Sequence, residues 1–305
     1  MRVSVIGQAA FGADTVDALT ADGHEIVAIS APELVNGAVD PLWAKAEEFE
    51  IPLIDTRRLA KRETGWLADK KPDLGIMAFV TAILPPRVLD TPHQGTIEYH
   101  PSLLPRHRGR SAMNWAIIQG DQTTGLTIFW VDQGIDTGPI LLQKEAHIDE
   151  QDTMGSLYFE KLYPMGLDAL KEAVRLVEKG DAPRLPQDET LATYEPPCED
   201  EHAVIDWNAP ARDVYNLVRG CNPRPGAHTR FLGSTLRLFD VELLDQSSGE
   251  PGVVAEVTDD GVVVGLNGGA LKLLRVMPEG AKKLPAADWA KPAALKPGTH
   301  LGTPL

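Results

Sequence analysis

Short apolar segments recur along the first part of the chain and are separated by stretches with helical periodicity. We expect strands at 2–6, 26–30, 51–54 and 74–79, and helices between them at 13–22, 41–50 and 56–70. Apolar runs without alternation are typical of strands buried on both faces, and their alternation with helices indicates βαβ units. The pattern predicts an α/β fold with a Rossmann-like, doubly wound and mostly parallel sheet.

A long helix is expected to follow the last apolar strands of this region. It begins at Asp152, is kinked at Pro164 because proline donates no hydrogen bond, and ends at Gly180. Residues 181–203 contain four prolines and have a net charge of −6, which is typical of a linker. We therefore expect a first domain at 1–183 and a linker at 184–203.

The remaining residues, 204–305, change to a β pattern after one short helix at 210–220. Strands are expected at 235–244, 253–257, 262–266 and 270–277. The turns T-D-D-G and N-G-G that join them are typical of hairpins, and short strands joined this way suggest a small closed or half-closed barrel. The second domain is therefore expected to be a small β-barrel.

Composition places the chain among ordinary globular proteins. It has 305 residues, of which 43% are hydrophobic and 24% charged, enough for two domains. No apolar run approaches the ~18 residues of a membrane span, and the start M-R-V-S-V-I-G reads as a strand entering a glycine turn, not as a signal peptide. We expect a cytoplasmic protein without a membrane contact. Cys198 and Cys221 have no metal-ligand spacing, which predicts reduced structural thiols and no metal.

Two residues after predicted strands could carry acid/base chemistry. His100 ends a strand-like segment because Pro101 follows, and Asp136 lies in the glycine-rich loop G-I-D-T-G after the strand 126–130. If both strands run parallel in one sheet, the two side chains open at the same carboxyl edge, where ligands bind. A carboxylate beside a histidine fixes its tautomer and favours the imidazolium. Turn chemistry is the alternative, and spacing alone leaves both open.

Longer motifs favour the catalytic interpretation. The run H-P-S-L-L-P-R-H-R-G, with Asp136 downstream, resembles the formyltransferase family that uses 10-formyltetrahydrofolate. The likeness covers nearly the whole chain. The segments L-L-Q-K-E and A-P-R-L-P are most similar to the N-terminal hydrolase domain of 10-formyltetrahydrofolate dehydrogenase, and the tail L-K-P-G-T-H-L-G resembles the OB-fold-like C-terminal domain of methionyl-tRNA formyltransferase.

The resemblance implies a folate pocket and a catalytic pair, His100 and Asp136. The residues that it assigns to 10-formyltetrahydrofolate, the formyl donor, or to its product tetrahydrofolate are Phe79, Val80, Thr81, Ser102, Leu103, Leu104 and Gln133. Without the resemblance, Phe79 and Val80 would be read as core residues. Arg106 and Arg108 belong to a compact basic cluster that either forms a solvated face or contacts an anionic acceptor or the folate glutamate tail.

Glu98 is the main departure from the family pattern. Formyltransferases carry Asn-x-His, in which the asparagine amide can donate to the developing oxyanion, but here Glu98 stands two positions before His100. An ionised glutamate only accepts hydrogen bonds and would repel an oxyanion. Glu98 could be neutral through burial, could face outward, or could position an attacking water or amine.

These observations predict an enzyme that removes the formyl group from 10-formyltetrahydrofolate by hydrolysis or by transfer to a small acceptor. Two alternatives remain, a methionyl-tRNA formyltransferase and a non-catalytic folate-binding protein. The chain has a net charge of −15, and residues 204–305 are neutral overall, whereas tRNA binding needs a basic face. The charge argues against tRNA. The sequence leaves the acceptor and the oligomeric state open.

Overall fold

The computed structural model describes residues 1–246 and 249–302, so positions 247–248 and 303–305 of the expected C-terminal domain lie outside the described residues. The chain divides into two compact units. The N-terminal unit comprises Met1–Arg110, Thr124–Ala146 and Phe159–Glu195. The C-terminal unit comprises Ser111–Thr123, His147–Tyr158 and the residues from Pro196 onward.

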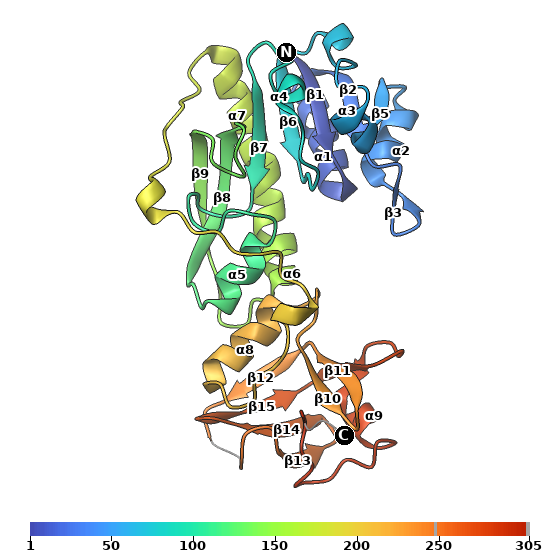
Figure 1. Ribbon diagram of the computed structural model, residues 1–305, viewed down its shortest axis with the longest axis vertical. Helices are drawn as coiled ribbons and strands as arrows, with labels where there is room; N and C mark the ends of the chain where they lie inside the picture. The colour runs from blue at the N-terminus through green and yellow to red at the C-terminus, as the bar shows by residue number, and fades with distance from the viewer. Residues whose placement is uncertain (247–248, 303–305) are drawn as a thin grey trace. The chain divides into compact units, whose positions relative to one another are not determined.

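The N-terminal unit is built on a seven-stranded sheet with the order β5-β2-β1-β6-β7-β8-β9 (Figure 1). The strands are β1 (Arg2–Gly7), β2 (Glu25–Ala31), β5 (Leu53–Asp55), β6 (Leu74–Ala78), β7 (Thr96–His100), β8 (Thr123–Trp130) and β9 (Ile140–His147). The five neighbouring strands β5, β2, β1, β6 and β7 all pair in parallel. The predicted Rossmann-like, mostly parallel sheet is confirmed.

Helices cover both faces of this sheet. One core joins the strands to α1 (Ala9–Ala21), α2 (Pro41–Glu48) and α7 (Tyr163–Lys179). A second core joins the opposite side to α3 (Thr56–Lys61) and α4 (Pro86–Leu89). Because both faces are covered, the central strand β6 is buried along its whole length and carries no polar side chain, as the apolar run in the sequence predicts. A two-stranded hairpin, β3 (Leu34–Val35) with β4 (Ala38–Val39), lies outside the sheet.

The direction of β8 corrects one expectation. Strand β8 runs antiparallel to β7, with Ile97 opposite Trp130 and His100 opposite Thr127. The premise that the strands before His100 and Asp136 are parallel is therefore wrong. The apolar sequence of β8 is buried along almost its whole length, and burial on both faces looks the same for either direction.

The helix expected from Asp152 is divided into three parts. A short helix, α6 (Met154–Ser156), is capped by Thr153, and a π-helical turn, Leu157–Leu162, follows. Helix α7 then begins at Tyr163 and ends at Gly180, which adopts a φ of 76°. Pro164 thus lies in the first turn of α7, where its missing N–H is not needed. Pro164, which was expected to kink a continuous helix, instead lies at the start of α7.

The C-terminal unit contains two four-stranded sheets in its described residues, with the orders β10-β11-β16-β17 and β12-β15-β14-β13. All their assigned pairs are antiparallel. The strands are β10 (His228–Phe231), β11 (Ser234–Leu238), β12 (Val241–Leu244), β13 (Val254–Thr258), β14 (Gly261–Leu266), β15 (Gly269–Leu273), β16 (Arg275–Pro278) and β17 (Leu284–Pro285). The α-helices of this unit are α5 (Ala112–Ile118), the short α6, α8 (Ala211–Gly220) and α9 (Ala286–Ala290).

Two strands that the alternation predicts as continuous are broken at matching positions. The segment 235–244 divides into β11 and β12, and the segment 270–277 divides into β15 and β16. Strand β11 pairs with β16, whereas β12 pairs with β15. At the break, the amide of Leu274 donates to the carbonyl of Asp240 at 2.9 Å. Each pair therefore passes from one sheet to the other at a corner, which a period-two pattern does not reveal.

The thiols of Cys198 and Cys221 are both free, with their Sγ atoms 3.9 Å apart. Within the described ranges 1–246 and 249–302, no helix combines the length and the apolar character needed to cross a bilayer.

Candidate functional site

His100 ends β7 and is only 6% exposed. Its Nε2 atom lies 2.8 Å from the carbonyl oxygen of His107. A carbonyl only accepts, so Nε2 carries the proton in the neutral ring and Nδ1 has the free lone pair. Nδ1 lies 3.6 Å from Oδ2 of Asp136. The ring is therefore anchored through one nitrogen, and its basic nitrogen faces a carboxylate.

Asp136 reaches His100 through the loop between β8 and β9. Its backbone adopts a φ of 56°, and its Oδ2 accepts a 2.6 Å hydrogen bond from the amide of Gly109. Gly138 is required by close packing, since a Cβ there would lie 1.7 Å from the carbonyl oxygen of Trp130. The structure thus brings His100 and Asp136 together, although β8 runs opposite to the expected direction.

Glu98 lies two residues before His100 on β7, so both side chains project from the same face of the strand. The pKa of the Glu98 carboxyl lies well above its usual range, first because burial disfavours the charged form and second because the negative charge of Asp136 is close. A protonated carboxyl has an O–H that can donate a hydrogen bond. Of the three alternatives for Glu98, this environment supports the neutral one.

The raised pKa of Glu98 predicts a pH-dependent stability. The native state binds this proton more tightly than the unfolded chain, so its stabilising contribution is complete below the ordinary pKa of 4.5 and is lost as pH rises through the folded-state pKa. Glu98→Gln removes the proton equilibrium, and we expect its free energy of unfolding to exceed the wild-type value increasingly as pH rises. Urea unfolding of both proteins from about pH 5 to about pH 8 checks this; parallel curves would contradict it.

The residues after β6 share the edge at which β7 ends, because Met77 and Glu98 are partners in a parallel pair. Phe79 and Thr81 are exposed there, and Phe79 adopts a φ of 61°. The alternative that Phe79 is a core residue is wrong. Gln133 is exposed in the loop that carries Asp136. Phe79 and Thr81 therefore lie at the edge of the sheet where β7 ends, whereas Gln133 is placed beside the site only through its loop, which also carries Asp136.

The expected folate contacts after β7 are more deeply built into the protein. Ser102 is fully buried, and its Oγ donates to the carbonyl of Arg106 at 2.7 Å. The Leu104 amide donates to Thr127 at 3.0 Å, and its carbonyl accepts from Gln143 at 2.9 Å. The backbone groups of Leu104 therefore already have protein partners, and the residue is only 3% exposed.

Arg108 requires a correction, because it was expected to contact an acceptor or anion. Its side chain is 1% exposed, and the guanidinium donates to Gln187, Glu189 and Tyr194. Burial of a charged group needs paired partners, which these residues supply. Arg108 is thus part of the internal framework, whereas Arg106 is exposed and stays a candidate for the acceptor contact.

Three groups around the site are missing from the sequence prediction. They are the carbonyl of His107, the amide of Gly109 and the side chain of Gln187, whose Nε2 donates to the carbonyls of Asp136 and Gly138 at 2.8 Å each. The first two belong to the R-H-R-G motif, but main-chain groups leave no mark in a side-chain pattern. Gln187 lies in the stretch expected to be a linker.

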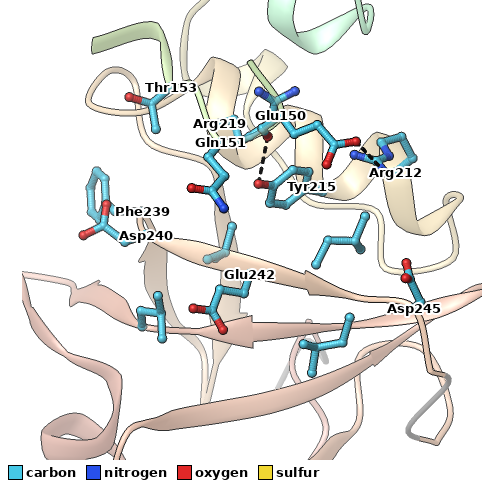
Figure 2. A pocket seen from close by; sticks show the side chains of 14 residues that line it. Glu150, Gln151, Thr153, Arg212, Tyr215, Arg219, Phe239, Asp240, Glu242 and Asp245 are labelled. Carbon is cyan, nitrogen blue, oxygen red and sulfur yellow. Dashed lines mark hydrogen bonds and ion pairs between the residues drawn. The ribbon is translucent and has the colours of Figure 1, made fainter. Parts of the chain in front are cut away.

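A separate hollow of about 530 Å³ lies in the C-terminal unit (Figure 2). Tyr215 donates to the carbonyl of Glu150 at 3.0 Å, and Arg212 lies 3.8 Å from the carboxylate of Glu150. Arg219 donates to the carbonyls of Asp149 and Asp152. None of the predicted catalytic or folate-binding residues lines this hollow. Across the described positions, no three His, Cys, Asp or Glu side chains are grouped as metal ligands would be.

Two protein families match most of this chain. Residues 1–172 match the family described as "Formyl transferase", and residues 198–293 match "Formyl transferase, C-terminal domain". The cytosolic 10-formyltetrahydrofolate dehydrogenase of Xenopus tropicalis is 37% identical over 309 residues, which covers 96% of this chain and 34% of the relative. This chain thus spans about a third of that relative. Methionyl-tRNA formyltransferase of Syntrophus aciditrophicus (strain SB) is 35% identical over 311 residues, 99% of both chains.

Solved structures show the same fold at low identity. HypX from Aquifex aeolicus in complex with tetrahydrofolic acid matches with a TM-score of 0.69 and 23% identity, over 96% of this chain and 47% of that chain. An N-formyltransferase from Helicobacter canadensis in complex with folinic acid and dTDP-3-aminofucose matches with a TM-score of 0.68 and 16% identity, over 93% and 100% of the two chains.

Proposed function

This chain belongs to the formyl transferase family, and from that premise we propose that it removes the formyl group from 10-formyltetrahydrofolate. Hydrolysis would give tetrahydrofolate and formate, and transfer to a small acceptor would give tetrahydrofolate and a formylated product. The dehydrogenase relatives support the choice of folate, and a tetrahydrofolate-bound structure shares the fold. The observation that carries the proposal is His100 anchored through Nε2 with Nδ1 facing Asp136.

In the first step, water or another nucleophile attacks the formyl carbon while Nδ1 of His100 accepts its proton. The C=O bond becomes a C–O⁻ single bond in a tetrahedral intermediate. The carboxylate of Asp136, 3.6 Å away, stabilises the positive charge that the imidazole gains. The His107 carbonyl holds Nε2 throughout, so the ring keeps its orientation.

The second step breaks the bond between the formyl carbon and N10 of the folate. The imidazolium of His100 returns its proton to N10, which leaves as the amine of tetrahydrofolate, and the carbonyl forms again. Glu98, neutral because its pKa is raised, donates to the oxyanion in place of the family's asparagine amide. The charge repulsion expected from an ionised glutamate is thereby avoided.

Turnover of purified protein with 10-formyltetrahydrofolate tests this function. We expect release of tetrahydrofolate with water alone, or after addition of a small nucleophile such as a thiol or a primary amine. Calorimetry that detects tight folate binding without any release of tetrahydrofolate would favour a non-catalytic folate-binding protein instead.

Methionyl-tRNA formyltransferase is a second candidate, because one such enzyme matches this chain over 99% of both lengths. The charge balance opposes it. Residues 204–305 carry equal numbers of acidic and basic side chains, and 181–203 have a net charge of −6. Since neutralisation of phosphates supplies most of the affinity for nucleic acids, an enzyme that binds tRNA needs a basic surface.

The charge balance predicts weak tRNA binding. We expect a Kd no tighter than ~10⁻⁵ M for initiator methionyl-tRNA at physiological salt, within the range of non-specific binding. Filter-binding titrations at several salt concentrations measure it. A submicromolar Kd that weakens steeply with salt, together with formylation of methionyl-tRNA, would contradict this and favour the second candidate.

A further inference from the structure

The segment 187–195 is part of the stretch expected to be a linker. It is hydrogen-bonded to residues 107–109, whose main chain holds the side chains of His100 and Asp136. The amide of His107 donates to Oγ1 of Thr193 at 2.8 Å, and the amide of Arg108 donates to the carbonyl of Thr193 at 3.0 Å. His107 and Gly109 are the residues whose main chains bind His100 and Asp136. The segment therefore contacts the scaffold of the site directly.

The buried side chain of Arg108 stabilises this pairing through hydrogen bonds to the same segment. Its guanidinium donates to Oε1 of Gln187 at 2.7 and 3.2 Å and to both carboxylate oxygens of Glu189 at 2.7 and 2.9 Å. Tyr194 adds its hydroxyl oxygen at 2.5 Å. A planar guanidinium with several fixed acceptors has little freedom to rotate, so Gln187 is held at one position.

The NH₂ group of the Gln187 side chain binds the loop that carries Asp136. Its Nε2 donates to the carbonyl oxygens of Asp136 and Gly138, both at 2.8 Å. One side chain thus joins Arg108, on the His100 side of the site, to the loop that carries Asp136. Both amide hydrogens and the amide oxygen have partners, which fixes the orientation of the group.

We propose that Gln187 is a positioning residue that holds the Asp136 loop against His100 by bridging it to the buried Arg108. The inference rests on the proposed function for its effect on turnover. The contact between Asp136 and the Gly109 amide, 2.6 Å long, gives a second readout that does not depend on activity.

The variant Gln187→Glu removes the two N–H donors of the side chain. The carboxylate keeps the shape of the side chain and an acceptor for Arg108, but it places negative oxygens beside the carbonyls of Asp136 and Gly138. We expect kcat to fall about 10- to 100-fold, the scale of a misplacement near 1 Å, while KM for the folate changes less than about threefold. Hydrogen exchange of the Gly109 amide should become at least about tenfold faster, because a displaced carboxylate protects it less.

Matched controls separate positioning from a general loss of stability. Gln122→Glu makes the same change at an exposed residue outside the site and should leave kcat and Gly109 exchange unchanged. The amide of Ile76, in the centre of the sheet, reports global opening. Gln187→Met, uncharged and similar in volume, repeats the test if Gln187→Glu does not fold.

Faster exchange at Gly109 but not at Ile76, together with a lower kcat, supports the proposal. Unchanged exchange at Gly109 overturns it whatever happens to kcat, and so does an equal acceleration at both amides. If the wild-type protein turns over no formyl folate, the proposed function fails, while Gly109 exchange still decides whether Gln187 holds the loop.

Discussion

Replacing His100 by alanine is expected to lower the release of tetrahydrofolate from 10-formyltetrahydrofolate by about two to four orders of magnitude, the usual scale for loss of a positioned acid/base group. Alanine removes Nδ1, the atom proposed to accept the proton of the nucleophile and to return it to the leaving amine. Asp136→Asn should have an effect in the same range, because the amide cannot stabilise the imidazolium 3.6 Å away.

Steady-state kinetics and folate titrations measure this effect. Binding of the folate should survive in both variants, since the expected contacts at Phe79 and Thr81 lie on a different loop, the one that follows β6. His93→Ala is the matched control, because His93 is exposed and precedes the opposite end of β7. Rates near the wild-type value in His100→Ala would remove His100 from the chemistry.

The second large effect concerns Glu98. If its protonated carboxyl donates to the oxyanion, Glu98→Ala should lower kcat by about 10²- to 10³-fold, the scale of one oxyanion donor. Glu98→Gln and Glu98→Asn keep a neutral donor, and we expect Gln, which has the same length, to retain turnover within about tenfold. The comparison of Gln with Ala therefore separates a donor from a passive side chain.

The dependence of kcat on pH shows whether the protonated or the ionised form of Glu98 supports turnover. If the neutral carboxyl is the active form, wild-type kcat should fall as pH rises through the folded-state pKa of Glu98, which lies above the ordinary value of 4.5. Glu98→Gln should lack that fall, because an amide does not titrate. A Glu98→Gln variant as slow as Glu98→Ala would instead indicate that an ionised Glu98 positions the attacking water or amine.

The sequence predicts the part of the fold that depends on side-chain burial. Apolar runs such as Leu74–Ala78 lie in the centre of the sheet, and the strand before Pro101 ends at His100 as expected. The motif around His100 also identifies the family. The direction of β8 is not predictable in this way, because a strand buried on both faces has the same pattern in parallel and antiparallel pairs.

The support of the site is harder to read from sequence. The groups that hold His100 and Asp136 are a carbonyl, an amide and Gln187, and main-chain groups are common to all residues. Gln187 lies among prolines and acidic residues whose composition indicates a linker. The positive φ of His107 and Asp136 is likewise invisible, since neither is glycine.

The formyl group itself provides the most direct test of the central claim. Purified protein is incubated with 10-formyltetrahydrofolate that carries ¹³C in the formyl group, and the label is followed by NMR in wild type, His100→Ala and Asp136→Asn. We predict that wild type transfers the label to formate, or to an added small nucleophile, with one tetrahydrofolate released per label, and that both variants leave it on the folate. Label that stays on a tightly bound folate in wild type, or that leaves only in the presence of methionyl-tRNA, would contradict the account.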